Sequence, residues 1–208
     1  YFAQRQLGTA LEEAKIALKD DRSYTPAYNL MALVKMSLGD QKAAEEAFQH
    51  ALQLSPGDPE VSNNYGWFLC QNKREAESFA YFDTALRNPL YQTPIIALAS
   101  SAECAMQIGK YPQAEAAAQR ALNLNPDYAR ALMTMANIKY RQQQYEQARH
   151  YVGEVHRVIE PTAASAWLAL RIARQTGNRE DEARYISLLK KKYPDSNEFR
   201  LLSEGKFE

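Results

Sequence analysis

Small and apolar positions repeat along the chain at a spacing of about 34 residues. The small–aromatic–small pattern of Ala44, Phe48 and Ala51 returns 34 residues later as serine, phenylalanine and alanine. Two further sets follow the same period once two residues are inserted within 88–94; they are Gly39, Gly109 and Gly177, and Pro56, Pro126 and Pro194. A fixed period over most of a chain indicates a repeat protein rather than an irregular helical bundle.

Each repeat predicts a pair of helices. In the unit 25–58, the pattern predicts one helix over Thr25–Leu38, a turn at Gly39-Asp40 and a second helix over Gln41–Leu54. The strong helix breakers of Ser55-Pro56-Gly57-Asp58 then end the pair.

Small residues indicate where the two helices of a pair touch. We expect Ala32 to face Ala44 and Gly66 to face Ser78, with Phe82 filling the gap where the helices diverge. This pattern resembles the tetratricopeptide repeat, which implies an all-α, right-handed superhelix of helix-turn-helix units. The expected units are 25–58, 59–92, 95–128, 129–162 and 163–196, with 1–24 as the second helix of a truncated first repeat and 197–208 as a C-terminal capping segment.

Composition and charge exclude several classes of protein. Hydrophobic residues make up 46% of the 208 residues, which excludes a disordered chain. Because 25 Lys and Arg balance 25 Asp and Glu, the chain lacks the cationic excess of a nucleic-acid-binding protein. No apolar run approaches the ~20 residues of a membrane-spanning helix.

The sequence contains no motif of a catalytic or metal-binding site. It has no Gly-rich phosphate loop and no hydrolase or metalloprotease signature. His50, His150 and His156 are scattered, and with the two cysteines they form no recognisable metal-ligand spacing. We therefore expect no enzyme, no cofactor and no metal. Taken alone, Cys70 and Cys104 leave two interpretations open: two inert thiols in a cytosolic protein, or one structural disulfide in an oxidising compartment.

The first helices of such an array line a concave groove, so one face of each predicted first helix is a candidate protein-binding surface. Asn63 and Asn64 are unusual there, because asparagine is a poor helix former. Their amides can hold an extended peptide backbone, although bonding within the array is the alternative. The predicted groove residues are Asn29, Leu33, Asn63, Asn64, Trp67, Asn137 and Tyr140; the same register places Trp167, Arg171 and Arg174 on the last unit.

Chaperone-binding tetratricopeptide domains hold a terminal carboxylate with lysines and an arginine on successive first helices. The corresponding positions here carry Asn29, Leu33, Ile96 and Ser100, and only Asn64 fits that clamp. A co-chaperone role is therefore disfavoured.

One run is more particular than the generic repeat. The residues Asn63–Cys70, followed by Ala80–Asp83, the insertion within 88–94 and Cys104, resemble the type IV pilus biogenesis/stability tetratricopeptide lipoproteins (PilF/PilW group) of Gram-negative bacteria. The resemblance implies a non-enzymatic periplasmic scaffold on the outer membrane that assists secretin assembly or stabilises pilus fibres. Its partners would be the outer-membrane secretin or other pilus components. Membrane contact is implied only through a lipid anchor that is absent from this chain.

The same resemblance favours a disulfide, because it places Cys70 and Cys104 in an oxidising compartment. Both lie late in neighbouring first helices, which pack side by side in such arrays, so the pairing is geometrically feasible. The alternative is a generic cytosolic tetratricopeptide adaptor or co-chaperone with two free thiols. A regulatory subunit of an enzyme is a third and more remote class.

Overall fold

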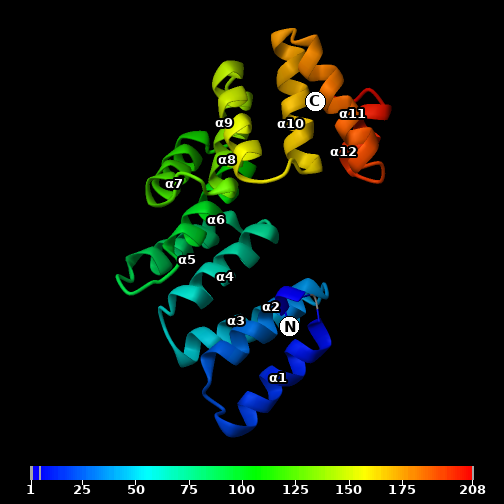
Figure 1. Ribbon diagram of the computed structural model, residues 1–208. Coiled ribbons are helices and arrows are strands. Elements are labelled where there is room, and N and C mark those ends of the chain that lie inside the picture. Colours follow the sequence, from blue (N-terminus) through cyan, green and yellow to red (C-terminus); the bar gives the residue numbers. More distant parts are fainter. Residues whose placement is uncertain (1, 5, 208) are drawn as a thin grey trace. The chain divides into compact units, whose positions relative to one another are not determined.

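The computed structural model describes residues 2–4 and 6–207, and every regular element in this part of the chain is a helix (Figure 1). Within these residues a short 3-10 helix, η1 (Phe2–Gln4), precedes twelve α-helices. Their bounds are α1 Leu7–Asp20, α2 Thr25–Ser37, α3 Gln41–Leu54, α4 Pro59–Gln71, α5 Glu75–Arg87, α6 Pro94–Gln107, α7 Tyr111–Leu124, α8 Ala129–Arg141, α9 Tyr145–Val158, α10 Ala163–Thr176, α11 Arg179–Lys192 and α12 Asn197–Ser203. The helices predicted over 25–38 and 41–54 are confirmed to within one residue. None of the helices in the described ranges is long and apolar enough to cross a membrane.

The contacts within the chain define two compact units, and the boundary between them along the sequence falls within α6. The first unit ends at Cys104 and the second begins at Ala105. Within the first unit α2 packs on α3, and α4 packs on α5; within the second, α8 packs on α9, and α10 packs on α11. Each unit is therefore built from helical hairpins of neighbouring elements.

Side-chain caps fix several helix starts. Asp40 accepts a hydrogen bond from the backbone of Ala43 at 3.2 Å and begins α3, and Asp58 accepts one from Val61 at 2.9 Å and begins α4. Thr162 and Ser165 form a reciprocal capping box at the start of α10. These bonds satisfy backbone donors that the first turn of a helix leaves unpaired.

A left-handed residue ends the first helix of each of five hairpins. The positive φ angles fall at Gly39 (80°), Lys73 (61°), Gly109 (73°), Gln143 (61°) and Gly177 (69°). Successive positions are 34 residues apart, except that 36 residues separate Lys73 from Gly109. That longer interval contains the insertion predicted within 88–94. The backbone thus follows the period even where the side chain is not glycine.

The hairpins of the first unit approach closely at small residues. Ala32 and Ala44 have no exposed surface. A Cβ added to Gly66 would lie 2.9 Å from the Phe82 ring and 3.1 Å from the backbone oxygen of Ser78. The predicted contact of Gly66 with Ser78 and Phe82 is therefore confirmed, and there is no room for a side chain at Gly66.

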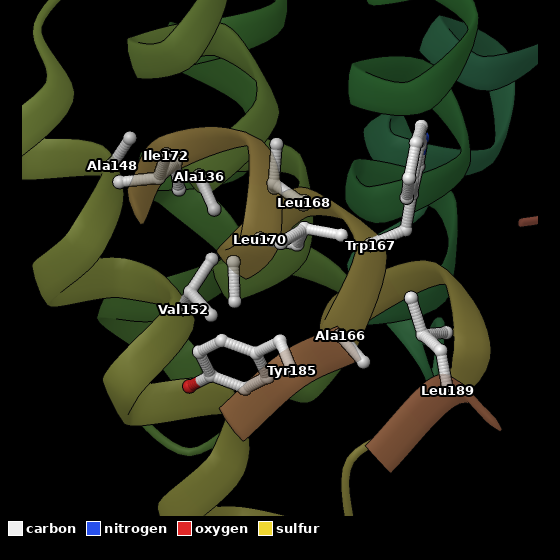
Figure 2. Packing of buried hydrophobic residues seen from close by; sticks show 11 residues of the cluster. Ala136, Ala148, Val152, Ala166, Trp167, Leu168, Leu170, Ile172, Tyr185 and Leu189 are labelled. Atoms are coloured by element: carbon white, nitrogen blue, oxygen red, sulfur yellow. The ribbon is translucent and has the colours of Figure 1, made fainter. Parts of the chain in front are cut away.

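The core of the second unit gathers around α10 (Figure 2). The small residues Ala136 and Ala148 are fully buried on α8 and α9. In Figure 2, Val152 and Tyr185 lie on one side of α10, while Trp167 points away from them. One helix thus contributes core residues on more than one side, including the buried Trp167.

Cys70 on α4 and Cys104 on α6 form a disulfide, with their Cα atoms 6.0 Å apart. The bond lies in a small buried cluster with Phe82, against which Trp67 and Phe79 pack. The Ser78 hydroxyl lies 3.4 Å from the Cys104 sulfur. The bond therefore joins two first helices of the first unit.

The disulfide generates the first prediction. Native, unreduced protein should show no titratable thiol, and Cys70→Ala with Cys104→Ala should lower the free energy of unfolding by about 3–4 kcal/mol, because closing a loop of this length restricts the unfolded chain. Thiol titration and urea denaturation measure the two effects. Two reactive thiols in protein prepared from an oxidising compartment would contradict it.

A second prediction concerns Gly66. Gly66→Ala should destabilise the protein by about 1–3 kcal/mol, because the new methyl group overlaps the Phe82 ring and the Ser78 backbone. Gly153→Ala on α9 is the matched control, since nothing lies within 4 Å of its added Cβ. The Gly153→Ala control should raise the free energy of unfolding by up to about 1 kcal/mol, because alanine is the better helix former. Equal shifts in denaturation midpoint for the two variants would refute the close contact.

The left-handed turns give a third prediction. Gln143→Gly should raise the free energy of unfolding by about 0.5–1 kcal/mol, because glycine adopts a positive φ without steric cost. Gln142→Gly is the control, since Gln142 has φ −79° and gains nothing from the change. Chemical denaturation of both variants should therefore give shifts of opposite sign.

Candidate functional site

Three asparagines form a hydrogen-bonded relay across two first helices of the first unit. Asn63 donates from Nδ2 to Asn64 Oδ1 at 3.2 Å, and Asn64 donates from Nδ2 to Asn29 Oδ1 at 3.1 Å. Asn29 lies on α2, and the other two lie on α4. The relay therefore orients each amide through its neighbour.

The members of the relay differ in exposure. Asn29 and Asn64 are half-buried, whereas Asn63 is only 3% exposed. Within the described residues, Asn63 Oδ1 is buried without a hydrogen-bond partner, and Asn29 Nδ2 donates no hydrogen bond to another described residue. Asn64 and Asn29 are therefore the members within reach of a partner, while Asn63 lies beneath Asn64 and supports it.

Leu33 on α2 and Trp67 on α4 lie about one helical turn after Asn29 and Asn64, respectively. Both are half-buried. Leu33 packs against the core around Phe48 and Tyr65, and Trp67 packs against the disulfide cluster. The structure thus places Asn29, Leu33, Asn64 and Trp67, which we name the amide–tryptophan face, on α2 and α4.

One cluster of charged groups in the first unit centres on Glu45 of the second helix α3. Arg74 contacts Glu45 at 2.5 Å and Glu77 at 2.7 Å, and Tyr65 donates to Glu45 at 2.9 Å. The hydrogen bonds that Arg74 donates to Glu77 and Glu45 raise the pKa of Arg74. Burial, and then the carboxylate of Glu45, raises the pKa of Tyr65 to about 12. The amide–tryptophan face is by contrast composed of neutral side chains, which suit an uncharged peptide backbone.

The predicted groove residues of the second unit make side-chain contacts with other residues of that unit. Asn137 donates to the Met133 carbonyl of its own helix at 2.9 Å. The Arg171 guanidinium lies 4.5 Å from the centre of the Tyr140 ring. A groove joining these residues to those of the first unit stays a prediction.

Sequence reasoning did not anticipate Phe207. Its ring stacks on Trp167, at one of the positions assigned to the groove. The only signal was an aromatic residue in the otherwise polar run Ser203–Glu208. This residue lies beyond the last predicted unit, where the period carries no information.

Two clefts in the second unit are lined by residues of α9 and α11, and the smaller of these two also by residues of α10. One of about 570 Å³ is lined by residues including His156, Tyr185 and Lys191, and another of about 430 Å³ includes Arg149 and Ile172. His156 is held by the Ser165 hydroxyl at 2.9 Å, and burial followed by the charge of Arg184 lowers its pKa. No group of metal-ligating side chains occurs in the described part of the chain.

Comparisons with known proteins agree with this architecture. A family model described as "Tetratricopeptide repeat" matches residues 3–151. The type IV pilus assembly protein PilF of Pseudomonas aeruginosa is 29% identical over 193 residues, which cover 91% of this chain and 77% of that protein.

Two solved structures extend the comparison to three dimensions. The crystal structure of PilW, a widely conserved type IV pilus biogenesis factor, matches with a TM-score of 0.89 and 32% identity over 98% of this chain and 93% of that one. The structure of Pseudomonas aeruginosa PilF matches with a TM-score of 0.85 and 27% identity over 99% of this chain and 93% of that one. The predicted all-α tetratricopeptide fold is thereby confirmed, and the chain belongs to the tetratricopeptide repeat family and, within it, to the PilF/PilW group of type IV pilus biogenesis factors.

Proposed function

We propose that this chain is a non-enzymatic protein-interaction scaffold for type IV pilus biogenesis, and that it binds a pilus assembly protein through the amide–tryptophan face. The secretin of the outer membrane, or another pilus component, is the proposed partner. We also propose that the chain consists of the five tetratricopeptide repeats predicted from the sequence, with residues 1–24 and 197–208 outside them.

The amide relay is the observation that carries this proposal. Asparagine in a helix interior is unfavourable, and three of them bonded across two helices hold their donors and acceptors in fixed directions. A pre-oriented amide loses less conformational entropy when it binds. Trp67 supplies an aromatic surface of the kind that commonly dominates binding energy.

The disulfide supports a periplasmic location, because disulfides persist in oxidising compartments and are rare in the cytosol. We further propose that the protein acts at the periplasmic face of the Gram-negative outer membrane as a lipoprotein. A generic cytosolic adaptor or co-chaperone is the alternative. It would need neither the disulfide nor the amide relay, and the carboxylate clamp of co-chaperones is missing.

The proposal predicts that Trp67→Ala with Asn64→Ala impairs piliation or the formation of secretin multimers. Loss of the aromatic anchor alone should weaken binding by about 2 kcal/mol, or roughly 30-fold. Pilus yield, secretin multimers and the envelope level of the protein are measured in a deletion strain that carries each variant. Circular dichroism of the purified variant should show unchanged helicity.

Glu46→Ala is the control, because Glu46 is exposed on the second helix α3. It should leave piliation unchanged. Normal pili in the double variant, with a defect in the Glu46 variant, would move the contact to the second-helix side and refute the amide–tryptophan face.

A further inference from the structure

Residue Phe207 lies against a cradle formed by α8 and α10 of the second unit. Its ring stacks on Trp167, with a centroid distance of 5.4 Å and an interplanar angle of 23°. The Arg174 guanidinium lies 3.6 Å from the centre of the same ring. Arg171 donates from Nε to the Phe207 carbonyl oxygen at 2.9 Å. We name Tyr140, Trp167, Arg171 and Arg174 the aromatic cradle.

The cradle contacts both the side chain and the backbone of one residue. Stacking and cation–π contact select an aromatic ring, and the Arg171 hydrogen bond fixes the carbonyl beside it. A peptide that carries an aromatic residue could be bound by the same two contacts, one to its ring and one to its backbone.

Arg171 retains unused capacity to bind an anion. Its side chain lies over the Tyr140 ring and bonds the Phe207 carbonyl, and no carboxylate of a described residue pairs with it. Arg174, by contrast, is 3.4 Å from Glu182. A carboxylate next to the bound aromatic residue would form a charge-assisted bond with Arg171.

The segment that delivers Phe207 is exposed over most of its length. After α12 the chain reverses at Gly205, with φ 68° and a backbone hydrogen bond from Lys206 to Leu201 at 2.9 Å. Residues 203–206 are all exposed, and Phe207 itself is only half-buried. Releasing Phe207 therefore opens the cradle without disturbing a fully buried side chain of the segment, and such local openings have a low free energy.

We propose that the aromatic cradle is a second protein-binding site, which takes a partner segment carrying an aromatic side chain next to a carboxylate. Phe207 occupies the site in the free protein, and the partner displaces it. The inference does not depend on the proposed pilus function, because it concerns the second unit alone.

The test uses the full chain with Phe207→Ala and an amidated, fluorescein-labelled peptide of residues 202–208, Leu-Ser-Glu-Gly-Lys-Phe-Glu. The variant should bind the peptide at least about tenfold more tightly than the wild type, because a short tether presents Phe207 at an effective concentration of about millimolar. Replacing the phenylalanine of the peptide by alanine should abolish binding, and replacing its last glutamate by glutamine should weaken it. Fluorescence anisotropy measures each affinity.

Two further measurements separate a binding site from a fixed cap. Adding Arg171→Gln to the Phe207→Ala variant should weaken peptide binding about tenfold, whereas Arg179→Gln, on the exposed first turn of α11, should not. In a Trp67→Phe background, acrylamide quenching of Trp167 should rise with Phe207→Ala and fall again when the peptide is added.

Three outcomes would overturn the inference. They are equal affinity of wild type and Phe207→Ala, no binding to a Phe207→Ala variant of normal helicity, and loss of helicity in that variant, which would make the segment a permanent part of the fold. Equal binding of the glutamate and glutamine peptides would overturn the carboxylate requirement.

Discussion

The close approach of two helices at small residues is the constraint on which the rest of this structure depends. Ala32 and Ala44 have no exposed surface, and Gly66 leaves no space for a methyl group beside Phe82. Side chains at such contacts set the distance between helices, and a packed core transmits a change at one contact to its neighbours. Asn64 of α4 reaches Asn29 of α2 because these two helices, one from each hairpin, also contact each other.

The helices were predictable because their signals are local. Glycine, proline and small residues recur within each unit, so the start and end of a helix are visible over a few residues. Lys73 and Gln143 show the limit of that argument. Neither residue favours a positive φ, yet both adopt one. The pairing of the flanking helices imposes the turn, and this tertiary influence leaves no trace in the residue itself.

The candidate sites were less predictable. Neighbouring residues on a helix point about 100° apart, and the repeat register alone did not distinguish Asn63, which is buried, from Asn64, which is half-buried. Trp167 and Arg171 were placed on the groove side from their register. Their contact with Phe207 depends on a chain reversal outside the repeat, so no periodic pattern could reveal it.

The buried oxygen of Asn63 has a consequence for the energy of the unbound protein. An acceptor that finds no donor within the described chain carries a desolvation cost of about 1–3 kcal/mol. The free state is therefore less stable than its apolar contacts alone would make it. Because Asn63 lies beneath Asn64, a single water that brings a donor to this oxygen would relieve that cost without enlarging the area of any protein contact.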